Sequence, residues 1–214
     1  MGAHCCDDHS HTPASGPEDQ RYRRALWIAL AVNVTMFAIE IGAGVASGSV
    51  ALKADALDFL SDSANYAISL LVIGMALRWR ARAALAKGLS LGIIGVWVAS
   101  TTLYNAVNGS VPDADIMGVI GFMALAANVG VAVMLYAFRS GDANMRSVWI
   151  CSRNDAIGNV AVLFAALGVF GTGTGWPDVI VGGIMAVLAI SGAWQIIRQA
   201  SAELRHTAFS APAE

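Results

Sequence analysis

The chain has 214 residues, of which 57% are hydrophobic and only 13% are charged, and its formal net charge is −2. Soluble domains carry about a quarter charged residues, so this composition is typical of a membrane protein. The near-neutral charge gives no indication of a nucleic-acid partner. Three cysteines, of which two are adjacent, do not form a disulfide framework and fit a reducing or metal-binding role.

Residues 1–20 read MGAHCCDDHSHTPASGPEDQ, and this polarity predicts a disordered cytoplasmic tail. A tract rich in histidine and cysteine is typical of metal binding, and such a tail could pass ions to the rest of the chain. The alternative is a flexible tail with incidental histidines. The side chains concerned are His4, Cys5, Cys6, His9 and His11.

Six apolar runs follow, and each is about as long as the ~20 residues that a helix needs to cross a bilayer. Turn-forming residues separate them: SGS after the first run, NGSVPDAD after the third, RSGDAN after the fourth and GTGTGWPD after the fifth. The pattern predicts an all-α, polytopic membrane protein with six transmembrane helices, at 25–46, 54–77, 84–107, 115–138, 146–170 and 177–197.

Lysine and arginine gather in alternate connectors, which the positive-inside bias places in the cytoplasm. They precede the first run, separate the second from the third and the fourth from the fifth, and follow the sixth; the other connectors hold only Lys53. Both termini are therefore expected in the cytoplasm. The expected organisation is the tail at 1–20, a six-helix transmembrane domain at 21–200 and a short cytoplasmic tail at 201–214.

The second apolar run carries three aspartates, Asp55, Asp58 and Asp62, in the stretch ALKADALDFLSDSANYAISLL. Residues spaced three and four apart share one face of a helix, so the three carboxylates form one acidic stripe. Ionisable residues inside a membrane cost a few kcal/mol and are functional candidates. Asp55 alone could equally be an exposed N-cap at the outer surface, but Asp62 lies about two turns deeper.

The fifth run, MRSVWICSRNDAIGNVAVLFAAL, carries Cys151 and Asp155, again four apart, with Asn159 one turn on. Two helices thus each present a pair of potential ligands at the same spacing. Together with Asp58 and Asp62 they make four oxygen and sulfur ligands, which suit a tetrahedral site for a divalent transition metal. Cys151 taken alone would more often be a small buried hydrophobic residue.

Other polar residues lie within the apolar runs. Glu40 either supplies a proton relay or accessory contact, or extends to the outer surface. Asn65 and Asn128 are expected to make interhelical hydrogen bonds. Arg153 is offset from the Cys151 and Asp155 face, and either pairs with a carboxylate such as Glu40 or reaches the cytoplasmic interface.

The stretches GSVALKADALDFLSD and CSRNDAIGN resemble the cation diffusion facilitator, or cation efflux, family over about residues 25–200. The resemblance implies a six-helix domain that exports divalent metals in exchange for protons. Asp58, Asp62 and Asp155 match the family's ligand positions, whereas Cys151 stands where the family usually has histidine or aspartate. Members commonly continue into a ferredoxin-like cytoplasmic domain. Residues 201–214 are too short to build that core, so dimerisation through the helices alone stays open.

We therefore expect a divalent-cation transporter of the bacterial inner membrane, with bilayer lipid, metal ion and protons as its partners, and no cofactor or enzymatic activity. Ligands must lose their protons to bind a metal, which couples the two fluxes. A site with three carboxylates and a thiolate favours Zn²⁺ over Mg²⁺ and Ca²⁺ and leaves Cd²⁺ and Co²⁺ open. The alternatives are a membrane metal sensor or adaptor that does not transport, and a membrane-embedded metalloenzyme.

Overall fold

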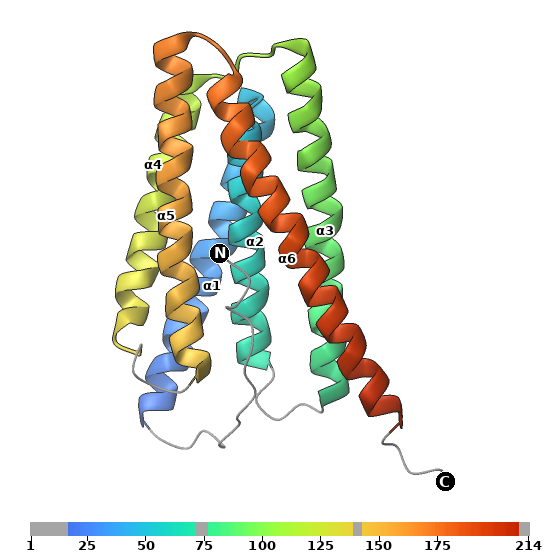
Figure 1. Cartoon of the computed structure of the whole chain (residues 1–214). Helices are drawn as coiled ribbons and strands as arrows, with labels where there is room; N and C mark the ends of the chain where they lie inside the picture. The colour runs from blue at the N-terminus through green and yellow to red at the C-terminus, as the bar shows by residue number, and fades with distance from the viewer. Residues whose placement is uncertain (1–16, 72–76, 139–142, 210–214) are drawn as a thin grey trace.

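A computed structural model describes residues 17–71, 77–138 and 143–209, although a few side chains within its helices, including that of Cys151, are not described. This part of the chain folds into helices and contains no strand, as the apolar runs predict (Figure 1). The helices are α1 Pro17–Ser47, α2 Val50–Leu71, α3 Leu77–Asn108, α4 Ala114–Tyr136, α5 Ala143–Thr172 and α6 Trp176–Phe209.

The helix ends at the outer side follow the predicted turn residues. Each outer connector contains a glycine with positive φ: Gly48 at 76°, Gly109 at 67° and Gly173 at 62°. An L-residue with a side chain rarely adopts this conformation, so glycine ends each preceding helix. Asp113 then starts α4 as its N-cap and accepts hydrogen bonds from the backbone N–H groups of Asp115 and Ile116.

Among the helices of the described residues, five are long and apolar enough to cross a membrane, namely all but α2. α2 carries the charged residues Lys53, Asp55, Asp58 and Asp62, which lower its hydropathy. α2 is nevertheless 22 residues long, which is enough to span a bilayer at 1.5 Å per residue. Its charges are tolerated because most of this helix is buried by the others.

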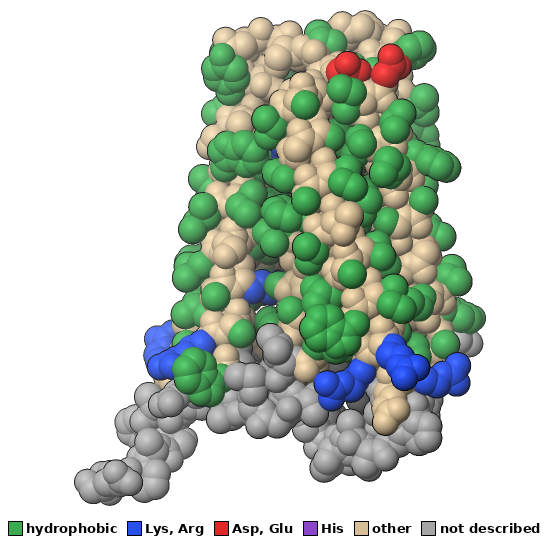
Figure 2. Space-filling model, turned by 180° about the vertical axis from the view of Figure 1, so that it is seen from behind, with side chains coloured by type: hydrophobic (Ala, Val, Ile, Leu, Met, Phe, Trp, Pro, Cys, Tyr) green, Lys and Arg blue, Asp and Glu red, His purple; other side chains and the backbone are tan. Residues whose placement is uncertain are grey.

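The distribution of charge gives the bundle two different ends. Figure 2 shows the lysine and arginine side chains gathered mainly at one end, acidic side chains at the opposite end, and hydrophobic side chains over the surface between them. α1 begins and α6 ends at the basic end (Figure 1). The positive-inside bias would place that end in the cytoplasm.

α2 is the central helix of the bundle, because it packs against α1, α3, α5 and α6. The most extensive contacts pair α1 with α2, α4 with α5, and α3 with α6. The metal ligands predicted on α2 are therefore surrounded by protein on several sides.

α3 and α6 approach closely along a row of glycines on α3. A Cβ added to Gly88, Gly92 or Gly95 would lie 2.9, 3.6 or 3.1 Å from the nearest side-chain atom of α6. Small residues at such positions let two membrane helices pack backbone to backbone.

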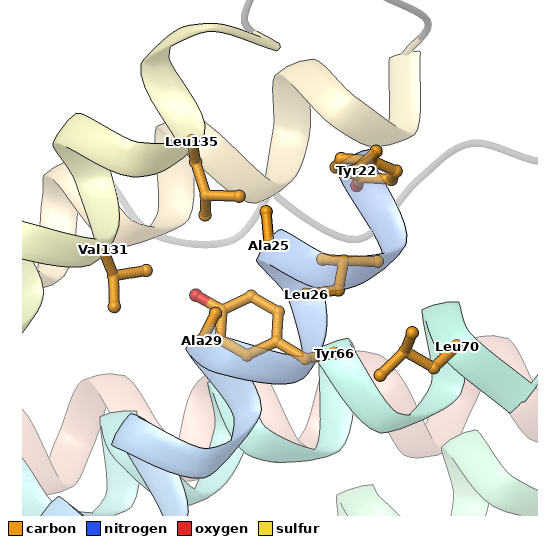
Figure 3. Close-up of a cluster of buried hydrophobic side chains, with 8 residues drawn as sticks. All are labelled: Tyr22, Ala25, Leu26, Ala29, Tyr66, Leu70, Val131 and Leu135. Carbon is orange, nitrogen blue, oxygen red and sulfur yellow. The ribbon is translucent and has the colours of Figure 1, made fainter. Parts of the chain in front are cut away.

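A hydrophobic cluster near the basic end joins α1, α2 and α4 (Figure 3). The ring of Tyr66 on α2 is 1% exposed and lies among residues of α1 and α4. This packing holds the ring in place, so that the hydroxyl group is the only part of the side chain that forms hydrogen bonds. The cluster consists of Tyr22, Ala25, Leu26, Ala29, Tyr66, Leu70, Val131 and Leu135.

Candidate metal site

The three aspartates of α2 lie on a buried part of the helix. Asp55 and Asp62 are 1% and 4% exposed, and Asp58 is half-buried. Burial of Asp55 excludes its alternative role as an exposed N-cap at the outer surface. The acidic stripe predicted from the spacing is therefore inside the bundle.

Asp155 on α5 faces these aspartates. Its carboxyl group lies within hydrogen-bonding reach of that of Asp62. Asp58 Oδ2 would be 3.9 Å from a Cβ on Gly158, almost one turn along α5. Three of the four predicted ligands are thus neighbours. Cys151 lies on α5 one turn before Asp155, but its side chain is outside the described residues.

The described aspartates do not converge on one point. Among the side chains that the structure describes, no three His, Cys, Asp or Glu form a group that could hold a metal ion. The ligand roles of Asp58, Asp62, Cys151 and Asp155 stay predictions. The tail residues predicted to bind metal, His4 to His11, precede the first described residue.

A tyrosine that the sequence pattern did not single out contacts Asp62, and a serine on α5 contacts this tyrosine. The hydroxyl of Tyr66 donates to Asp62 Oδ2 at 2.8 Å and lies 2.8 Å from Ser152 Oγ on α5. Tyr66 follows Asp62 by four residues and therefore lies on the same face of α2, which is the signal that could have revealed it. The pair links α2 to α5 beside the predicted ligands.

A chain of amides runs from α4 through α5 to the outermost aspartate. Asn128 Nδ2 donates to Asn159 Oδ1 at 2.8 Å, and Asn159 Nδ2 donates to Asp55 Oδ2 at 2.6 Å. The interhelical hydrogen bond predicted for Asn128 is confirmed. Asn159, predicted as an accessory residue, donates to Asp55 and accepts from Asn128.

Glu40 on α1 is 0% exposed, so it does not extend to the outer surface. Neither of its carboxyl oxygens has a hydrogen-bond donor within the described part of the protein. Its carboxyl group instead lies close to that of Asp55. Two facing carboxylates in a dry interior repel each other, and a proton or a cation between them would remove the repulsion.

A further aspartate, Asp178 in the first turn of α6, holds the beginning of α2. It is 0% exposed and accepts hydrogen bonds from Ser49 Oγ at 2.6 Å, Val50 N at 2.8 Å and Ala51 N at 3.0 Å. These N–H groups at the start of a helix have no partner within the helix. The close approach depends on Gly182, whose added Cβ would be 2.8 Å from the carbonyl carbon of Val50.

Two basic residues, Lys87 and Arg153, donate hydrogen bonds to asparagine side chains. Lys87 Nζ on α3 donates to Asn65 Oδ1 on α2, which confirms the interhelical hydrogen bond predicted for Asn65. Arg153 is exposed and donates to Asn154 Oδ1 at 3.2 Å. Arg153 does not pair with Glu40, because no hydrogen-bond donor among the described residues reaches the Glu40 oxygens.

Apolar helices around carboxylates that lie inside the bundle, of which Glu40, Asp55 and Asp62 are buried, define a polytopic membrane protein with acidic side chains in its interior. Comparison with known proteins gives the family. The sequence profile of the cation efflux transmembrane domain matches residues 26–205, and the chain belongs to that family. The resemblance seen in the two aspartate motifs is thereby confirmed.

Several named proteins are similar to this chain. It is 26% identical over 209 residues to zinc transporter ZitB of Escherichia coli (strain K12), a match that covers 92% of this chain and 66% of ZitB. It is 25% identical over 202 residues to metal cation efflux system protein CzcD of Cupriavidus metallidurans, covering 89% and 62%. It is 22% identical over 208 residues to the cadmium, cobalt and zinc/H(+)-K(+) antiporter of Bacillus velezensis, covering 89% and 64%. The chain thus spans slightly less than two thirds of the length of these relatives.

Proposed function

We propose that this protein exports a divalent transition-metal ion from the cytoplasm across the bacterial inner membrane, in exchange for protons. The observation that carries the proposal is the placement of Asp58, Asp62 and Asp155 beside one another inside a membrane-spanning bundle. Carboxylates at this depth are costly unless they bind a cation or a proton. A transporter whose carboxylates bind the metal ion and the protons in turn would account for their presence inside the membrane.

The ligand set proposed is Asp58 and Asp62 from α2 with Cys151 and Asp155 from α5. Such a mixture of oxygen and sulfur favours Zn²⁺, with Cd²⁺ and Co²⁺ as further candidates, over Mg²⁺ and Ca²⁺. The names of the similar proteins, which refer to zinc, cadmium and cobalt, support this choice.

Coupling to protons follows from the chemistry of the ligands. Carboxyl groups must be deprotonated when they coordinate a metal, so an arriving cation displaces protons and returning protons expel the cation. Tyr66 would hold Asp62 in one orientation while this exchange occurs. Glu40 and Asp55, linked to Asn159, would form an accessory acidic pair nearer the outer end of the bundle. Rocking of the helices around the site would expose it to each side in turn.

The test is metal flux into inside-out proteoliposomes with an imposed pH gradient. Zn²⁺ uptake that depends on the gradient is expected for the wild-type protein, and none for Asp62→Asn or Asp155→Asn at equal insertion. Asp115→Asn is the matched control, since Asp115 is exposed at the start of α4, far along the chain from both ligand pairs. It should transport as the wild type does.

Two results would contradict the proposal. Wild-type flux in Asp62→Asn and Asp155→Asn would remove these carboxylates from the pathway. Metal binding without flux in the wild-type protein would favour the sensor or adaptor over the transporter.

A further inference from the structure

The chain has only two lysines, Lys53 and Lys87, and one of them lies beside the acidic site. Lys87 is within Ala81–Asn108, the apolar stretch of α3 that is long enough to cross a membrane. Its side chain is half-buried, and its ammonium group donates to Asn65 on α2. A cationic group within a membrane-spanning stretch is costly, and such residues are commonly functional.

Asn65 connects Lys87 to a predicted metal ligand. The Asn65 side chain lies within hydrogen-bonding reach of the Asp62 carboxylate, three residues earlier on the same face of α2. An amide that accepts from an ammonium and donates to a carboxylate aligns its dipole between the two charges. The positive charge of Lys87 therefore acts on Asp62 across one amide, without a direct ion pair.

The location of Lys87 is on the basic side of the ligands. α2 runs from the outer end towards the basic end, so Asn65 lies nearer the basic end than Asp62 does. α3 starts at the basic end, and Lys87 is reached about three turns into that helix. A cation that enters from the cytoplasm would meet this ammonium next to the first carboxylate.

We propose that Lys87 sets the charge preference of the site: its fixed positive charge offsets one of the negative ligands and so disfavours a trivalent ion relative to a divalent one. The inference deepens the proposed function and rests on it. The repulsion between Lys87 and a bound cation grows in proportion to the charge of that cation. Removal of the Lys87 charge should raise the affinity of the site for every cation, and the increase should be largest for trivalent ions.

A purely structural role makes a different prediction. If Lys87 only ties α3 to α2 through Asn65, a neutral side chain that keeps this hydrogen bond should bind metal as the wild type does. Lys87→Gln can keep the hydrogen bond without the charge, and Lys87→Met removes both. Lys87→Arg keeps the charge and should restore wild-type binding.

The experiment is direct metal binding to the purified full chain in mild detergent, with Co²⁺ followed by absorption and Tb³⁺ by its luminescence. Lys87→Met and Lys87→Gln should each bind Co²⁺ roughly tenfold more tightly and Tb³⁺ about thirtyfold more tightly than the wild type. Arg82→Met is the matched control, because Arg82 carries the same charge on the same helix but is exposed and stacks over Trp79. The affinities of Arg82→Met for Co²⁺ and Tb³⁺ should change less than about twofold, because solvent and salt screen an exposed charge.

Each outcome decides the inference. If the wild type binds Co²⁺ and both neutral variants bind Co²⁺ and Tb³⁺ with unchanged affinity, Lys87 does not set the charge preference, and the metal site itself still stands. If only Lys87→Met differs from the wild type, the role is structural. If the wild type binds no Co²⁺, the proposed metal site is wrong and the role of Lys87 fails with it.

Discussion

Replacement of Asp178 by alanine should destabilise the protein strongly, although Asp178 is not a predicted metal ligand. The carboxylate joins the first turn of α6 to the first turn of α2 through three short hydrogen bonds, from Ser49, Val50 and Ala51. All of these groups are buried. The substitution would leave one hydroxyl and two backbone N–H groups without their acceptor at a buried position.

The size of the effect can be worked out from these contacts. Hydrogen bonds to a charged group contribute about 1.5–3 kcal/mol each, so three would contribute about 5–9 kcal/mol if nothing replaced them. Asp178 lies near the end of the bundle, where water can enter the space that the side chain leaves. We therefore expect a loss of about 3–5 kcal/mol in the free energy of unfolding. Asp178→Asn keeps one acceptor oxygen and should lose about half as much.

The matched control is Asp113→Ala. Asp113 also caps a helix, and it accepts from the N–H groups of Asp115 and Ile116 at 3.0 and 3.1 Å, but it is exposed to solvent. Loss of such a cap costs about 1 kcal/mol. Unfolding with a denaturing detergent, followed by tryptophan fluorescence and far-UV circular dichroism, measures both variants. Equal losses for Asp178→Ala and Asp113→Ala would refute the argument that burial makes the Asp178 bonds the stronger ones.

Three further predictions concern the proposed site and the tail. Tyr66→Phe keeps the packed ring but removes a donor to Asp62, so Co²⁺ affinity should fall about tenfold; unchanged affinity would show that the hydroxyl does not orient the carboxylate. Cys151→His should favour Zn²⁺ relative to Cd²⁺ and Cys151→Asp should admit harder ions such as Mn²⁺, as measured by competitive flux; an identical ranking would remove Cys151 from the site. Deletion of residues 2–20 should lower the apparent metal affinity modestly and leave maximal flux nearly intact, whereas complete loss of flux with normal insertion would give the tail an essential role.

The sequence was sufficient for features that depend on local spacing. The apolar runs predict the helices, and the intervals between Asp55, Asp58 and Asp62 predict their shared burial, because both follow from the period of a helix. The burial of Glu40 was open in the sequence, since a glutamate at that depth can either extend outward or turn inward. Because α1 packs against α2, the Glu40 side chain is buried in the interior of the bundle.

Contacts between distant segments could not be predicted in the same way. Asp178 is 127–129 residues from the groups that it caps, and only the close packing of α6 on α2 brings them together. The same holds for Tyr66 and Ser152, which are 86 residues apart. One sequence gives no measure of which helix faces lie opposite each other, and these partners depend on that arrangement.

The row of glycines between α3 and α6 has a consequence for how this pair responds to its surroundings. Lipid tails are as apolar as the side chains that they contact, so exclusion of water does not hold these helices together; shape does. The pair should therefore be indifferent to the choice of lipid or detergent and sensitive to a single added methyl group, since a Cβ on Gly88 would stand 2.9 Å from Ile197. At the contact between α3 and α6, the protein should tolerate a change of lipid or detergent more easily than an increase in side-chain volume.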